Sequence, residues 1–228
     1  LAGPVIAAAV ILKTPIDDLN DSKKISKNKR EFLSSLIMQN SFFAFGSVSH
    51  KEIDEINIHN ASLLAMKRAI LNLNIKPNKV LVDGLYLPDV EFKKEAIVGG
   101  DAIISEISAA SIIAKVYRDN LMLDFDKKYP IYEFDRHKGY PTKLHKEMLK
   151  IHGSCFIHRK SFKEALYSYG LTVNYEMIKG MRTEDAILKI FDINKQSISN
   201  ERLKKLISKK QSLSQNFFTN ISIYSFRG

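Results

Sequence analysis

Two aspartates in the middle of the chain carry the clearest chemical signal in this sequence. Asp83 follows the apolar run 79–82, and Asp101 follows the run 96–98 and two glycines. Each run predicts a short strand with its aspartate just beyond the carboxyl end, so the two carboxylates could converge. Paired carboxylates suit Mg²⁺ or Mn²⁺, which can neutralise charge on the attacking and leaving oxygens of a phosphodiester. The alternative is that Asp83 forms a turn and Asp101 caps a helix.

A second group of side chains is suited to binding nucleic acid. Tyr140 lies in the predicted loop 137–142, between a glycine and a proline, where its ring can stack on a sugar or a base. The alternative is a loop tyrosine that only closes over the core. Four basic residues are predicted to contact phosphates, with two polar residues as lesser contacts: Lys23, Lys24, Lys138 and Arg159, with Asn20 and Ser22. For each lysine the alternative is a solvated surface position.

Other charged residues on the predicted helix 105–126 favour a different role. Lys115 and Arg118 lie three apart, and Asp119 adjoins them. An internal ion-pair network therefore competes with contact to nucleic acid. We do not place Asp119 in the metal site.

Histidine and cysteine give weaker signals. The histidines of the second half lack a tight helical ligand pair, which favours structural or phosphate-facing roles over a transition-metal site; they are His137, His145, His152 and His158. The single cysteine, Cys155, excludes an internal disulfide and a cysteine-based metal cluster. It lies in an ordinary loop with no base beside it, so we expect a buried or inert thiol and a cytoplasmic protein.

The composition favours a polyanionic partner. The 228 residues have a formal net charge of +10 and a pI near 9.5, and clustered Lys and Arg attract phosphates and release their counterions. A coding bias toward lysine explains the same charge without any partner. No apolar stretch approaches the roughly 18 residues of a membrane span, so we predict a globular protein with no membrane segment.

Alternating strands and helices predict an α/β fold that positions these side chains. The predicted strands are 4–12, 42–48, 79–82 and 96–98; the predicted helices begin at Ser26, cover 53–74 and 105–126, run from Thr142 to about 151, and run from His158 to about 169. Residues 1–170 form one domain in this interpretation. Residues 171–228 hold two amphipathic segments and a β-prone end, which predicts a helical appendage or a partly disordered tail.

Several motifs together resemble ribonuclease HII in order and spacing. They are Leu19-Asn20-Asp21-Ser22-Lys23-Lys24, Glu52-Ile53-Asp54 with Asn57-Ile58, Leu81-Val82-Asp83-Gly84, Gly100-Asp101, the segment 107–115 with Arg118-Asp119, and the loop 137–142 with His158-Arg159. The resemblance covers about residues 1–168. It implies a ribonuclease H-like fold, a mixed five-stranded sheet flanked by helices, with a helical carboxyl-terminal region.

The resemblance also implies an activity and assigns residues to it. The implied enzyme is an endonuclease that cuts the RNA strand of RNA–DNA hybrids by two-metal-ion catalysis, and so removes embedded ribonucleotides and primer remnants from DNA. Asp83 and Asp101 match metal-binding carboxylates, and Tyr140 matches a contact to the deoxyribose beside the RNA–DNA junction. The expected partner is a hybrid duplex bound by a monomer. The family often has lysine where Gly99 stands and a basic residue near Ile103, which predicts weaker phosphate-side electrostatics here.

The resemblance further predicts a segment that this chain does not contain. The family places an Asp-Glu pair and a Gly-Arg-Gly turn immediately before the proline that precedes the position of Leu1. Only two of the four expected carboxylates remain, and the turn that senses the ribose 2′-hydroxyl is missing. We therefore expect an incomplete chain that is inactive as it stands and that becomes a nuclease once the upstream segment is restored.

Other functions compete with this one. A nucleic-acid-binding module without catalysis is favoured by the basic charge and by the absent Asp-Glu pair, and an inactive fragment of the nuclease fits the same facts. A small-molecule phosphate-binding α/β enzyme is least favoured, because the sequence has no glycine-rich strand-turn-helix fingerprint. Metal-dependent cleavage after extension of the amino terminus separates the nuclease from the binding module.

Overall fold

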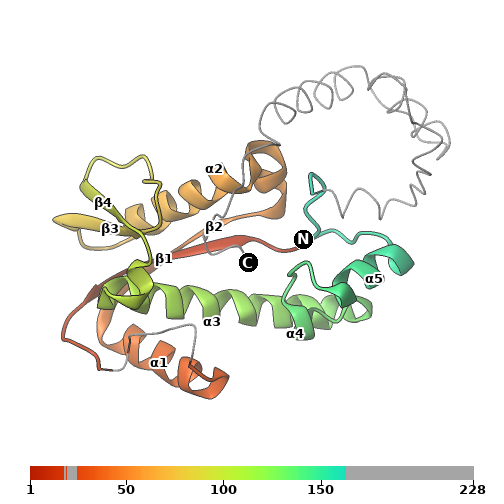
Figure 1. The fold of residues 1–228 in the computed structure, drawn as a ribbon, viewed down its shortest axis with the longest axis horizontal. Coiled ribbons are helices and arrows are strands. Elements are labelled where there is room, and N and C mark those ends of the chain that lie inside the picture. Colours follow the sequence, from red (N-terminus) through yellow and green to blue (C-terminus); the bar gives the residue numbers. More distant parts are fainter. Residues whose placement is uncertain (18, 20–24, 163–228) are drawn as a thin grey trace.

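The computed structural model describes residues 1–17, 19 and 25–162 of the chain (Figure 1). The elements follow in the order β1 Val5–Leu12, α1 Lys27–Gln39, β2 Ser41–Val48, α2 His50–Leu71, β3 Lys79–Asp83, β4 Lys93–Ile97, α3 Ser105–Lys128, α4 Phe134–His137 and α5 Lys143–His152. Two 3₁₀ helices, η1 Gly100–Ala102 and η2 Pro130–Tyr132, precede α3 and α4. The predicted α/β class is confirmed. None of the described helices is both long and apolar enough to cross a lipid bilayer.

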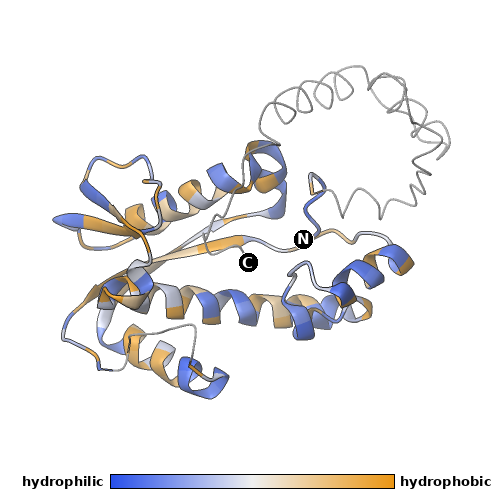
Figure 2. Cartoon of the chain, in the orientation of Figure 1, coloured by the Kyte–Doolittle hydropathy of each residue, from blue (hydrophilic) through white to orange (hydrophobic). Residues whose placement is uncertain are grey.

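β1 and β2 form an antiparallel pair that packs between helices, with Val5 opposite Val48. Alternate residues of a strand point to opposite faces. Ala8 and Val10 accordingly pack with buried residues of α1 and α3, whereas Val5 and Ala7 pack with buried residues of α2. Figure 2 shows that β1 is hydrophobic along its length, as a strand covered on both faces requires.

α2 lies directly against β2 because Gly46 has no side chain. A Cβ at Gly46 would lie 2.0 Å from the main-chain oxygen of Ala65 on α2. α2 begins with a capping box, in which the Ser49 hydroxyl accepts the Glu52 N–H and the Glu52 carboxylate accepts the Ser49 N–H. α2 has a kink at Asn57, where φ is 68°; its first part is fixed by the capping box, and its second part lies against β2.

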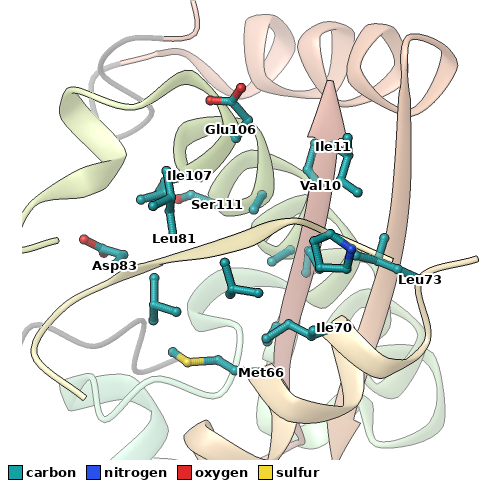
Figure 3. A pocket seen from close by; sticks show the side chains of 18 of the residues that line it. Val10, Ile11, Met66, Ile70, Leu73, Leu81, Asp83, Glu106, Ile107 and Ser111 are labelled. Atoms are coloured by element: carbon teal, nitrogen blue, oxygen red, sulfur yellow. The ribbon is translucent and has the colours of Figure 1, made fainter. Parts of the chain in front are cut away.

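β3 and β4 form a separate parallel pair, in which Asp83 lies opposite Ile97. Val80 and Val82 of β3 pack with Ile70 of α2. An apolar groove of about 490 Å³ lies between β3 and β1, with residues of α2 and α3 completing its walls (Figure 3). Both strand pairs thus pack against α2, but no strand of one pair is hydrogen-bonded to a strand of the other.

The predicted five-stranded sheet needs a correction in detail. The described part of the chain has four strands in two pairs, and no ladder there joins β1 to β3. The groove separates these two main chains, and a ladder needs them within hydrogen-bond reach. Each pair therefore presents the edge of one strand to the groove.

The end of the described chain returns to the amino terminus. Ala2 and His158 form an isolated antiparallel bridge, and the Arg159 N–H donates to the Leu1 carbonyl (2.9 Å). The helix predicted to start at His158 is therefore wrong for residues 158–162, because the main chain of His158 and Arg159 bonds to the start of the chain and that of Lys160 and Ser161 bonds to Asp54. The rest of that helix, and every prediction for residues 171–228, lies outside the described residues.

Candidate metal and nucleic-acid site

The two aspartates predicted to bind metal lie on adjoining segments. Asp83 ends β3, and its Oδ1 accepts a hydrogen bond from the main-chain N–H of Gly100 (2.9 Å). Gly100 opens η1, and Asp101 follows it directly. The structure thus places the main chain of Gly100, the residue before Asp101, beside the carboxylate of Asp83.

Two glycines make this arrangement possible. Gly99 adopts a left-handed conformation with φ 69° and ψ 25°, which glycine tolerates without strain. A Cβ at Gly100 would lie only 2.6 Å from Cδ1 of Ile107 on α3. The main chain of η1 consequently lies tight against α3, and Asp101 is only 3% exposed. The turn predicted at this glycine pair is confirmed.

The described residues supply part of a donor set for a divalent metal. Carboxylate oxygens are the ligands that Mg²⁺ and Mn²⁺ prefer, and Asp83 and Asp101 provide two such groups. Across the ranges described, no three His, Cys, Asp or Glu side chains gather where they could hold an ion. Glu106, in the first turn of α3, lines the same groove as Asp83 (Figure 3). It was not among the predicted site residues, although its position soon after Asp101 was a visible signal.

The groove beside Asp83 has mainly aliphatic walls. Val10 and Ile11 of β1 lie on one side of it, and Met66 and Ile70 of α2 close another side (Figure 3). Its polar lining is sparse. The groove therefore suits an apolar segment of protein chain better than a phosphate backbone.

The main-chain carbonyl of Tyr140 is hydrogen-bonded, and two basic side chains lie over its ring. Its carbonyl oxygen accepts hydrogen bonds from the Thr142 N–H (2.8 Å) and from Nδ1 of His145 (2.9 Å). Nζ of Lys115 and Cζ of Arg118 lie 5.1 Å and 5.4 Å from the ring centroid. Tyr140 is half-buried. This position is compatible both with stacking on a sugar and with covering the core.

Arg159 has a different role from the predicted phosphate contact. It is 1% exposed, its Nε donates to the Gly3 carbonyl (3.0 Å), and its guanidinium lies 5.2 Å from the Phe162 ring. Burial lowers its pKa to about 9. The buried Arg159 side chain thus holds the main chain just before β1 in place. Lys138 is half-buried and donates from Nζ to the Asp135 carbonyl, and its phosphate contact stays a prediction.

The charges on α3 divide between two tasks. Nζ of Lys115 and Oδ1 of Asp119 form the predicted ion pair at 2.8 Å. Arg118 instead donates to main-chain carbonyls, from Nη1 to Lys138 (2.9 Å) and from Nε to Pro4 (3.2 Å). α3 therefore ties the Tyr140 loop to the start of β1.

Four of the predicted polar and phosphate contacts fall outside the described residues: Asn20, Ser22, Lys23 and Lys24. Leu19, just before them, is described. Its side chain is buried, and its carbonyl accepts a hydrogen bond from the Ser108 hydroxyl of α3. Leu19 is thus attached to α3 at Ser108.

Three histidines form a buried cluster. His137, His145 and His158 are 5%, 0% and 0% exposed, and the His137 and His145 rings stack with centroids 4.1 Å apart. Burial lowers the pKa of His145 to about 3 and of His158 to about 4, so both rings are neutral near pH 7. Burial also raises the pKa of the Cys155 thiol to about 11. The structural role predicted for these histidines and the inert thiol agree with this geometry.

Comparisons with known protein sequences point to one family. The family model described as Ribonuclease HII matches residues 1–165. Ribonuclease HII of Borrelia recurrentis (strain A1) is 56% identical over 165 residues, which cover 71% of this chain and 91% of that protein. Ribonuclease HII of Borreliella burgdorferi is 53% identical over 165 residues, with the same two coverages.

Solved structures give the same fold. The crystal structure of the ribonuclease H2 from Pyrococcus horikoshii OT3 is similar with a TM-score of 0.59 and 29% identity, covering 74% of this chain and 92% of that one. The crystal structure of Bst-RNase HIII in complex with Mn²⁺ has a TM-score of 0.55 at 13% identity, covering 75% and 66%. At that identity the second match shows the fold alone.

Proposed function

This chain belongs to the ribonuclease HII family, and on that premise we propose that it hydrolyses the RNA strand of RNA–DNA hybrids, including ribonucleotides embedded in DNA, with divalent metal ions. It is an enzyme of the ribonuclease H type. One observation carries the proposal for the site. The hydrogen bond from the Gly100 N–H to Asp83 Oδ1 joins the segment that ends in one aspartate to the segment that carries the other.

We assign the metal to Asp83 and Asp101, whose donor chemistry fits Mg²⁺ or Mn²⁺. A pair of such ions supplies charge neutralisation on the attacking and leaving oxygens of the phosphodiester when bound. Asp101 is buried, and a carboxylate attracts a cation more strongly where water is excluded. The close packing of Gly100 against Ile107 holds both aspartates on a rigid base.

We assign the hybrid duplex to the surface that includes Tyr140. Lys115 lies beside its ring, Lys138 lies two residues before it, and the chain as a whole has a net charge of +10. Positive charge attracts the phosphates of either strand without reading sequence. The tyrosine ring would then stack on the sugar beside the RNA–DNA junction.

We assign the groove between β1 and β3 to an extended segment that carries the family's Asp-Glu pair. The groove is apolar, and a strand edge lies on each side of it within the described residues. A strand seated there would hydrogen-bond to both edges and complete the five-stranded sheet. Because Asp83 lines the same groove, carboxylates on that strand would join the aspartates already present.

The test compares two proteins on one substrate. The 228-residue chain and a version extended at its amino terminus with the Asp-Glu pair and the Gly-Arg-Gly turn are each incubated with a labelled hybrid duplex and Mn²⁺. We expect the extended protein to cut the RNA strand and the shorter chain to bind without cutting. Asp83→Asn in the extended protein should remove cleavage and keep binding.

The other outcomes separate the competing functions. Binding without cleavage by both proteins would favour the non-catalytic module. Full cleavage by the 228-residue chain would show that the metal site does not need the added segment. Competition by short nucleotides but not by duplex would favour a small-molecule phosphate enzyme.

A further inference from the structure

A continuous row of hydrogen bonds runs from Cys155 through His158 and His145 to Tyr140. The Tyr140 carbonyl can only accept, so Nδ1 of His145 carries the proton that it donates across 2.9 Å. Neutral His145 then has a bare Nε2, which accepts from Nε2–H of His158 (3.0 Å). Nδ1 of His158 is in turn bare and accepts the main-chain N–H of Cys155 (2.9 Å). Each ring nitrogen of His145 and His158, which we call the histidine row, is therefore either a donor or an acceptor, and not both.

The surroundings keep the histidine row in this one arrangement. Both rings are fully buried, and burial keeps the pKa of each far below its usual range. The rings of Tyr132 and Phe134 pack against them. A buried donor or acceptor that loses its partner is costly, so rotation of either ring is opposed.

A third histidine holds the residue before Tyr140. Nδ1 of His137 accepts the Gly139 N–H (3.2 Å), and Nε2 of His137 donates to the Tyr132 carbonyl (2.7 Å). Gly139 has a φ of 80°, and a Cβ there would lie 2.7 Å from the Ala2 oxygen. The conformation of residues 139–140 is thus set by buried side chains and close packing from elsewhere in the chain.

We propose that His145 and His158 are positioning residues that fix Tyr140 so that its ring meets the sugar at the RNA–DNA junction. His145 holds the Tyr140 carbonyl directly. His158 holds His145 in the tautomer that can donate to it. The contact with the sugar rests on the proposed function, whereas the positioning of Tyr140 does not.

A single fluorophore can report the positioning without any activity. The chain has no tryptophan, so Tyr140→Trp places one indole at this site. His145→Asn and His145→Gln are then added separately. Asparagine puts an amide donor near the place of Nδ1 and can still bond to the carbonyl of residue 140, whereas glutamine puts its amide near the place of Nε2 and cannot.

We expect His145→Gln to raise the acrylamide quenching constant of the indole about threefold, because one of the two hydrogen bonds to the carbonyl of residue 140 is lost. His145→Asn should leave the constant close to that of Tyr140→Trp alone. His152→Gln is the matched control, because His152 is exposed and lies outside the histidine row. Equal quenching in the asparagine and glutamine variants would overturn the proposal.

His158 gives an independent pair of variants. His158→Gln keeps an amide donor toward Nε2 of His145 and should retain most of the protection, whereas His158→Leu removes the donor and should behave like His145→Gln. If His158→Leu does not fold, the two polar substitutions at His145 still decide. Loss of protection in His158→Gln equal to that in His145→Gln would count against a role for the donor.

The sugar contact is tested in the extended protein by two cleavage rates, one at an RNA–DNA junction and one in a uniform RNA strand. We expect the ratio of these rates to fall about tenfold, or about 1.4 kcal/mol, in His145→Gln and to stay unchanged in His145→Asn. An unchanged ratio with increased quenching would overturn the sugar contact and keep the positioning. Absence of any cleavage by the unsubstituted extended protein would instead count against the proposed function.

Discussion

The two ends of the described molecule differ in what surrounds their charged side chains. The histidine end, residues 129–162 with residues 1–4, is held by buried Arg118, Arg159 and the histidine row. The aspartate end, residues 79–103, contains β3, β4 and η1, borders the open groove, and exposes the side chains of Leu85 (72%) and Val98 (70%).

The histidine end therefore contains its own binding partners, whereas the aspartate end has the features of a site for a ligand. At the histidine end, charged and polar side chains bond to main-chain carbonyls of distant segments, so the local structure is rigid without any addition. At the aspartate end, two carboxylates, exposed aliphatic groups and two strand edges lie near one another, which is the composition of a binding site. Substitutions at the first end should act on stability and on the position of Tyr140, and those at the second end on the cleavage step itself.

The largest expected effect is at the aspartate end. Asp101→Asn in the extended protein should lower hybrid cleavage by about 10²-fold or more, because a lost metal carboxylate removes several kcal/mol of charge stabilisation. Single-turnover rates with Mn²⁺ measure this, and EDTA should abolish the rate of the parent. Asp89→Asn is the control, since its side chain is 95% exposed and pairs with Lys67. A similar loss in both variants would contradict a specific role for Asp101.

The histidine end should set the pH dependence of stability. Folded His145 and His158 have pKa values of about 3 and about 4, below the unfolded value near 6.5, so between those values only the unfolded chain takes up protons. Each histidine should lower the free energy of unfolding by up to about 1.4 kcal/mol per pH unit as pH falls from about 6 to about 4.

Urea denaturation at pH 7.5, 6 and 5 measures this slope. His158→Gln should reduce the slope, because one of the buried rings that resist protonation is gone. A free energy of unfolding that stays constant over this range would show that the buried rings accept protons in the folded state.

Packing should likewise differ between the contact of β2 with α2 and the wall of the groove. Gly46→Ala forces a Cβ to within 2.0 Å of the Ala65 oxygen and should cost about 1–3 kcal/mol of stability, as overpacking does elsewhere. Ala110→Val adds volume on α3 toward the groove and should cost less than about 1 kcal/mol. Thermal or urea unfolding compares the two, and an equal cost would mean that the groove wall is as tightly packed as the sheet.

Another small effect is expected at the edge of the histidine end. The Asp54 carboxylate of α2 accepts the main-chain N–H groups of Lys160 (2.9 Å) and Ser161 (2.7 Å). Asp54→Ala should therefore lower the free energy of unfolding by about 1 kcal/mol. Glu55→Ala is the control, because Glu55 is exposed on the next position of the same helix. Equal unfolding midpoints for the two variants would show that these two hydrogen bonds to Asp54 do not stabilise the fold.

Local features of the fold were predictable from the sequence because they depend on neighbouring residues. Ser26 and Thr142 cap α1 and α5 as predicted, since a hydroxyl reaches an N–H three residues on without help from the rest of the chain. The apolar run that forms β1 and the glycine turn before Asp101 follow the same logic. The family itself was visible in motif order, and the comparisons confirm it.

Only the tertiary structure decided what became of residues whose partners lie far along the chain. Nothing local to Arg159 predicts its burial against Gly3, and nothing near His145 in sequence indicates a bond to His158. The groove that separates β1 from β3 likewise is not indicated by the sequence of either strand. Patterns along the chain set dihedral angles and caps, whereas burial and long-range hydrogen bonds arise only when distant segments compete for the same space.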